Sequence, residues 1–203
     1  MSDVPLNERR RLAQTLRELV HQVATVDVDD AELGPIAAAL DPLCARLARE
    51  PRLVLNVSGL HSSDHARARS GREPLYDRDP LVGLSNPLAP PLLRVEGGGL
   101  TEWEVTFSET YEGHPGLVHG GYVAAVIDHV LGVTASSSGF ASMTGTLTTV
   151  YRRPTPLNTR LVCVGSVERV EGRKVFCKAT LEAEGELVVE AEGVYLRVDP
   201  DRF

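Results

Sequence analysis

The chain has 203 residues, of which 42% are apolar and 24% charged, and its formal net charge is −7. These values fit a globular protein with one domain of ordinary size and an extension. The acidic balance argues against a nucleic-acid partner or a basic membrane-binding face. We expect a cytoplasmic protein without a membrane span, because no apolar run approaches about 20 residues and residues 1–6 lack the pattern of a secretory signal.

Three cysteines, Cys44, Cys163 and Cys177, lie far apart in the sequence. An odd number at such spacings is typical neither of a disulfide framework nor of a metal knuckle. We therefore expect small, buried side chains in a reducing compartment.

Two amphipathic helices are predicted within residues 6–49. The first has apolar side chains at helical spacing, and Asp27–Asp30 provides a break and a possible cap before the second. The apolar positions are Leu12, Leu16, Leu19, Val20 and Val23 in the first helix, and Leu33, Ile36, Ala37, Leu40, Leu43 and Leu47 in the second. We expect these stripes to pack on the main domain or on a partner subunit.

Residues 50–91 form a polar, irregular stretch that ends in a cluster of prolines, which blocks helix formation. His61, Asp64 and His65 lie within it and allow the alternative of a metal site. Histidine pairs in polar loops are more often solvated, so we expect no metal.

Strand patterns begin at Leu92. Residues 92–96 and 100–107 form two candidates, and residues 142–154, 159–170, 173–184 and 187–198 form four more around tight turns. Between the two groups, residues 120–136 have the length and composition of a buried helix. The pattern predicts the α+β class, with an antiparallel sheet that covers one long helix.

The central helix carries a carboxylate, Asp128, among apolar residues. Burial there is costly unless the group is paired, hydrogen-bonded or open to a cavity. One interpretation is a structural aspartate bonded to a neighbouring threonine or backbone group; the other is a reactive group.

His119, Gly120 and Gly121 begin this helix. The first N–H groups of a helix have no partner within it and carry the positive end of its dipole. Two glycines let a ligand approach those groups closely, so the helix start can hold an oxyanion. The alternative is that Gly-Gly is only a tight turn.

Asp128 follows Gly120 by eight residues, which corresponds to about 12 Å along a straight helix. One carbonyl cannot contact both groups on one helix. If they act together, they come from different chains, and the sequence then predicts a homodimer with two equivalent sites.

The run Glu112-Gly-His-Pro-Gly-Leu-Val-His-Gly-Gly-Tyr-Val-Ala-Ala-Val-Ile-Asp128, followed by Gly132, resembles the PaaI-like hotdog-fold acyl-CoA thioesterases. It is most similar to the branch of thioesterase superfamily members 4 and 5. The run from Thr144 to Leu157, with Tyr-Arg-Arg-Pro at residues 151–154, is similar to the family's strand. The resemblance covers about residues 80–198. It divides the chain into a helical extension with an irregular linker, 1–79, and a hotdog domain, 80–203.

The resemblance implies hydrolysis of an acyl-CoA to the free acid and CoA, without a cofactor, because coenzyme A is part of the substrate. The N–H of Gly120 or Gly121 would bind the thioester carbonyl. Asp128 would attack it or activate a water, and Thr144 would orient the water or the carboxylate. His119 would shape the turn and support the site.

The resemblance also implies that Arg152 and the region of Arg173 and Lys174 contact the CoA phosphates; the alternative is that they are solvated strand ends. Asn86 is a candidate for closing the acyl pocket. Several relatives carry Asn or Gln in the loop before the motif histidine, where the amide helps to fix the carbonyl or the water. His114 lies in this loop here and is the candidate for that role.

Three alternatives stay open at this point: a non-catalytic acyl-CoA-binding protein, an acyl-carrier-protein thioesterase and a hotdog hydratase. The hydratase has least support, because the Asp128-His129 pair lacks the five-residue spacing of that group. The pattern leaves the acyl chain, the choice of dimer or tetramer and the role of residues 1–79 undetermined.

Overall fold

The computed structural model describes residues 8–51, 77–90, 92–95, 101–137 and 139–198. The histidine pair suggested as a metal site, His61 and His65, lies outside them. In the described ranges there is no group of three or more side chains suited to a metal ion. Those ranges also contain no helix that is both long and apolar enough to cross a bilayer.

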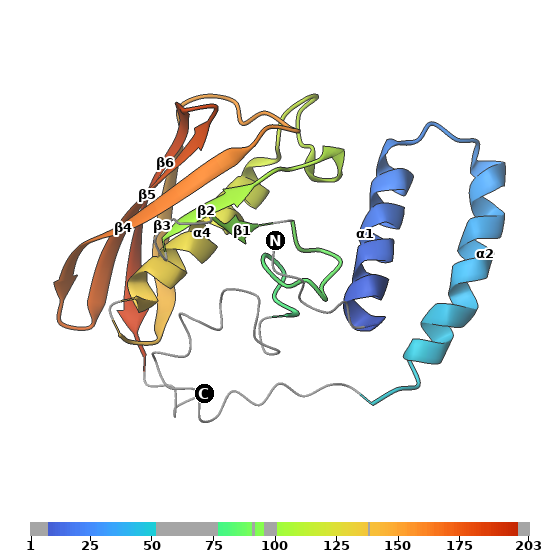
Figure 1. The fold of residues 1–203 in the computed structure, drawn as a ribbon, viewed down its shortest axis with the longest axis horizontal. Coiled ribbons are helices and arrows are strands. Elements are labelled where there is room, and N and C mark those ends of the chain that lie inside the picture. Colours follow the sequence, from blue (N-terminus) through green and yellow to red (C-terminus); the bar gives the residue numbers. More distant parts are fainter. Residues whose placement is uncertain (1–7, 52–76, 91, 96–100, 138, 199–203) are drawn as a thin grey trace.

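Six antiparallel strands form one sheet in the order β1-β2-β4-β5-β6-β3. Their bounds are Leu93–Arg94 (β1), Glu102–Val105 (β2), Ser142–Tyr151 (β3), Leu161–Glu171 (β4), Lys174–Ala183 (β5) and Glu186–Arg197 (β6). The sheet curves around α4, Gly120–Ser136, as Figure 1 shows. This arrangement confirms the predicted α+β hotdog fold.

Alternating side chains explain the sheet's two faces. On β5, Val175, Cys177, Ala179 and Leu181 are all buried, and they face the helix. The tight turns before and after this strand use positive φ angles, 56° at Gly172 and 81° at Gly185. Glycine adopts this backbone region without steric cost, so both hairpins close in short connections.

The strand β3 differs from the simplest expectation for successive strands. It pairs with β6 rather than with β4, the next strand in sequence. Residues 152–160 form a longer connection, so no tight turn forces β3 and β4 together. As a result, β3 is an edge strand.

The helix α4 packs most closely in its second half, where every residue from Val130 to Ser136 is buried. Gly165 on β4 allows this close approach. A β-carbon at that position would lie 2.3 Å from Oγ1 of Thr134. The first half of α4 is less covered, and Asp128 is only half-buried.

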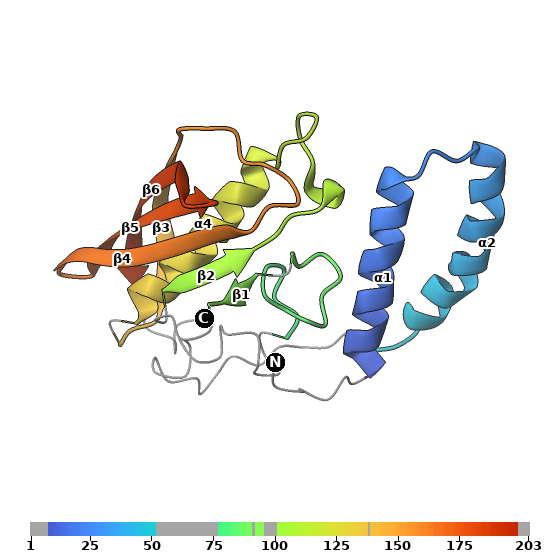
Figure 2. The ribbon, with the colours of Figure 1, turned by 45° about the horizontal axis from the view of Figure 1, so that its top comes forward.

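The two predicted N-terminal helices are present as α1, Glu8–Thr25, and α2, Asp30–Leu47, and Asp29 caps the second. Figures 1 and 2 show both to one side of the sheet and α4. Packing of the apolar stripes on the main domain, one of the two predicted arrangements, is partial for the described residues: Leu16 and Leu19 of α1 are half-buried. Packing on a partner subunit stays a prediction. Leu12, Val20 and Val23 of α1 are exposed, and α2 buries no residue.

The face of α1 that contacts the rest of the chain carries polar side chains together with the buried Ala13. Arg10 bonds with Asp77, Arg17 donates to the carbonyl oxygen of Leu84 at 2.5 Å, and His21 lies 3.3 Å from the hydroxyl of Thr110. Thr110 belongs to the short 3-10 helix Glu109–Tyr111. These polar contacts join residues far apart in the sequence, and hydrophobic periodicity alone does not reveal them.

Candidate active site

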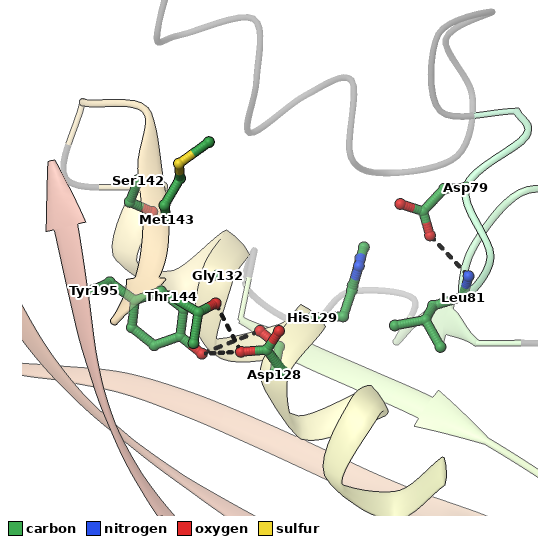
Figure 3. Close-up of a pocket in the computed structure, with 9 residues that line it drawn as sticks. All are labelled: Asp79, Leu81, Asp128, His129, Gly132, Ser142, Met143, Thr144 and Tyr195. Carbon is green, nitrogen blue, oxygen red and sulfur yellow. Dashed lines mark hydrogen bonds between the residues drawn. The ribbon is translucent and has the colours of Figure 1, made fainter. Parts of the chain in front are cut away.

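The carboxylate of Asp128 is held by two hydroxyl groups. Thr144 Oγ1 and Tyr195 Oη each donate a hydrogen bond to Oδ1 of Asp128 at 2.9 Å (Figure 3). The Tyr195 hydroxyl also lies 3.2 Å from the backbone oxygen of Asp128. Among the described residues, none donates to the second carboxylate oxygen, Oδ2.

The sheet brings these two hydroxyls together. Thr144 on β3 and Tyr195 on β6 are directly opposite in the strand register, and a β-bulge follows at Gly145. Bulges bend a strand and can direct a side chain toward a site. Gly193 leaves room for the Tyr195 ring, since a β-carbon there would lie 2.6 Å from Cε2 of that ring.

Burial keeps Tyr195 in its hydroxyl form. The side chain is fully buried, and burial, together with the negative charge of Asp128, raises the pKa of Tyr195 well above its usual value. The phenol therefore remains a hydrogen-bond donor to the carboxylate at neutral pH.

Tyr195 was not predicted as a site residue. It lies 67 positions from Asp128 and outside every motif used in the sequence analysis. One signal was available. The inward-facing positions of β6 are Val189, Ala191, Gly193 and Tyr195, and only the last carries a polar group.

Asp128 lines a cavity of about 330 Å³. Its lining includes Tyr195, Thr144 and Ser142 from the sheet, and His129 and Gly132 from α4. On the other side, Asp79 and Leu81 contribute from the irregular segment that precedes β1, as Figure 3 shows. His129, the neighbour of Asp128 on α4, also faces the cavity, and its ring packs edge-on against Trp103 at a centroid distance of 5.3 Å.

The start of α4 separates the roles of the two glycines. Nδ1 of His119 accepts a hydrogen bond from the N–H of Gly121 at 3.0 Å, so His119 is the N-cap. The N–H of Gly121 is therefore already bonded. The N–H of Gly120 has no acceptor among the described residues, and the Tyr151 hydroxyl donates to the carbonyl oxygen of Gly120 at 2.7 Å.

The predicted phosphate-binding residues lie at opposite ends of the sheet. Arg152 follows β3 and forms an ion pair with Glu190 at 2.8 Å. Arg173 and Lys174 lie at the β4–β5 turn, near the residues that pair with the start of β3. Within one chain, therefore, Arg152 lies toward the Gly120 end of α4. Arg173 lies toward the start of β3, where Thr144 is.

Two further predicted residues lie elsewhere. Both polar ends of Asn86 are bonded within its own segment, to the N–H of Leu88 and to the carbonyl oxygen of Arg78, each at 2.9 Å. Asn86 is not among the residues that line the cavity. His114 is exposed in the loop before His119. Substrate contact by either residue stays a prediction.

Comparisons with known proteins agree on one family. The thioesterase superfamily profile matches residues 115–190. A solved thioesterase superfamily protein is 31% identical, with a TM-score of 0.77, and the match covers 95% of this chain and 96% of the other. The chain belongs to the thioesterase superfamily.

Curated relatives in this superfamily match a smaller part. The mouse acyl-coenzyme A thioesterase THEM4 is 38% identical over 93 residues, which cover 45% of this chain and 40% of the relative. The bovine THEM4 is 39% identical over 93 residues, 38% of its length. This chain thus aligns with less than half the length of these relatives.

The superfamily profile includes Gly120, Asp128 and Thr144, but it ends before Tyr195 and begins after Asp79 and Leu81. Three residues around the cavity are therefore outside the matched region. The structure assigns them to the site by contact rather than by motif.

Proposed function

We propose that this thioesterase superfamily protein hydrolyses acyl-CoA thioesters to free acid and CoA. The observation that carries the proposal is the position of the Asp128 carboxylate. Two hydroxyl groups hold its Oδ1, and the residue lines the cavity. The curated relatives named as acyl-coenzyme A thioesterases support the substrate class. The reaction uses water and this chain's own groups, and coenzyme A enters as part of the substrate. A cytoplasmic role in fatty acid metabolism is part of the proposal.

In this mechanism Asp128 removes a proton from a water molecule as the water oxygen forms a bond to the thioester carbonyl carbon. Thr144 and Tyr195 keep the carboxylate in place. The N–H of Gly120 donates to the developing oxyanion, where the positive end of the helix dipole also stabilises negative charge. Collapse of the intermediate breaks the carbon–sulfur bond, and the proton held by Asp128 passes to the departing CoA sulfur.

The site is shared by two subunits in this proposal. Gly120 and Asp128 are about 12 Å apart on one helix, too far for one carbonyl to contact both. Among the described residues, no strand pairs with the outer edge of β3, and that edge could pair with the β3 of a second copy. Antiparallel pairing there would bring the Gly120 and Arg152 end of one subunit toward the Asp128 and Arg173 end of the other. A homodimer, or a tetramer of such dimers, satisfies this geometry.

Release of free thiol from acyl-CoAs tests the activity, with Asp128→Asn as the decisive variant. Loss of the base should lower kcat by about 10²–10⁴-fold. Asp41→Asn, on the exposed surface of α2, is the matched control and should leave kcat unchanged. Tight acyl-CoA binding without turnover by the wild type would favour a binding protein instead, and equal turnover by Asp128→Asn would exclude this mechanism.

A mixing experiment tests the shared site. Gly120→Pro removes the N–H donor at the first helical position, where proline is tolerated. Each variant alone should be inactive. A dimer with one Asp128→Asn and one Gly120→Pro subunit keeps one intact shared site, so random mixing should restore about a quarter of wild-type activity. If both groups acted within one chain, the mixture would stay inactive.

A further inference from the structure

We propose that residues 77–81, held in place by α1, form the wall that limits the acyl group, and that they restrict the site to short, uncharged acyl chains. This inference rests on the proposed acyl-CoA function and names the substrate class for it. It also gives the N-terminal extension a role in specificity. Asp79 and Leu81 are the two residues of this wall that line the cavity.

The wall is a tightly built turn. Oδ1 of Asp79 accepts hydrogen bonds from the N–H of Leu81 at 2.8 Å and from the N–H of Val82 at 3.1 Å. Gly83 packs back on the turn so closely that a β-carbon would lie 2.5 Å from the backbone nitrogen and oxygen of Asp79. The side chain of Leu81 is therefore held at a fixed position facing the cavity.

A buried ion pair fixes this turn to α1. Arg10 donates to Oδ1 of Asp77 at 2.8 Å, and the hydroxyl of Ser85 donates to the other oxygen. The side chains of Arg10 and Asp77 are only 10% and 9% exposed. Buried pairs with all oxygens bonded define one geometry. The buried ion pair thus joins this turn to α1.

The size and charge of the part of the cavity that one chain provides indicate the substrate class. About 330 Å³ is at the small end for ligand pockets, which span about 300–1,000 Å³. Leu81 would meet the end of the acyl chain opposite Asp128. Among the described lining residues, Asp79 and Asp128 are carboxylates and only His129 can carry positive charge. A second carboxylate on the acyl chain would be repelled.

The test compares butyryl-, octanoyl- and succinyl-CoA with the full-length protein. For each, kcat/KM is measured by thiol release, and the Kd is measured by calorimetry in the Asp128→Asn background. Leu81→Ala removes the wall's apolar side chain. Asp79→Asn removes its charge but keeps the oxygen that accepts from Leu81 and Val82. Leu88→Ala, on an exposed leucine of the same segment, is the matched control.

Leu81→Ala should raise the preference for octanoyl- over butyryl-CoA about tenfold in kcat/KM, and in Kd to a similar degree. Asp79→Asn should raise the kcat/KM for succinyl-CoA relative to that for butyryl-CoA about tenfold. Leu88→Ala should leave both ratios unchanged. Unchanged ratios in the first two variants, with activity retained, would overturn the wall.

The two proposals can fail separately. If the wild type hydrolysed no thioester but the wall variants shifted the Kd ratios, the hydrolase proposal would fail and the wall would stand. If acyl-CoAs were neither hydrolysed nor bound, both would be overturned.

Discussion

Asp77 and Asp128 are two carboxylates that each accept hydrogen bonds from two side chains, but their partners differ. Asp77 uses both oxygens, and one partner is the cation Arg10. Asp128 uses one oxygen, and both partners are neutral hydroxyls. Asp77 is buried and Asp128 half-buried. Asp77, whose charge is compensated and whose oxygens are both bonded, connects two segments of the structure. Asp128, whose neutral donors bond only one oxygen, is held in place but can still react.

Arg10→Ala should have the largest effect on folding. It leaves Asp77 buried without its cation, and breaking a buried pair in this way costs about 3–5 kcal/mol. The free energy of unfolding, measured by denaturant titration, should fall by that amount. Arg11→Ala is the control, because Arg11 is 74% exposed and lies 3.9 Å from Glu8; its effect should be within about 1 kcal/mol. Equal effects from the two variants would contradict the comparison.

Tyr195→Phe and Thr144→Val should act on catalysis. Each removes one donor to Asp128, which costs about 1–2 kcal/mol, so kcat should fall about tenfold while KM changes little. The two changes share one carboxylate oxygen, and their effects should therefore be non-additive in a double-mutant cycle. Thr180→Val, at a half-buried position of β5 and away from the β3 edge, provides a control for the replacement of a hydroxyl by a methyl group. A rise in KM with unchanged kcat would instead place these hydroxyls in substrate binding.

The sequence predicted much of the fold because local patterns determine it. Strand patterns between tight turns predicted β4, β5 and β6 to within two residues at each end, and the apolar run predicted α4 at the bounds that the structure shows. The run around His119 and Asp128 also identified the region of the site. These features depend on neighbours in the sequence, where side-chain periodicity and helix-start chemistry are visible.

What the sequence did not reveal depends on long-range contacts. The pair Arg10–Asp77 and the pair Tyr195–Asp128 each join residues 67 positions apart. Arg10 belongs to a face of α1 that looks solvent-exposed, since the apolar stripe lies elsewhere on the helix. Likewise, the hydrogen bond from the N–H of Gly121 to Nδ1 of His119, which leaves Gly120 as the open donor, depends on the rotamer of the His119 side chain.

Alkaline pH provides the smallest effect and tests the contact between Tyr195 and Asp128 directly. Burial and the charge of Asp128 raise the pKa of Tyr195 in the folded state, whereas an unfolded tyrosine titrates near 10. Above about pH 10 the unfolded chain therefore loses this proton while the folded chain keeps it, and stability falls as pH rises. By pH 11 the loss of stability from Tyr195 should be about 1 kcal/mol.

Tyr195→Phe has no such proton, so the difference in the free energy of unfolding between wild type and Tyr195→Phe should narrow by that amount between pH 8 and pH 11. The difference should not change between pH 7 and pH 8, where tyrosine does not titrate. A difference that stays constant up to pH 11 would mean that Tyr195 ionises as readily in the folded protein as in water. That result would contradict the buried hydrogen bond between Tyr195 and Asp128.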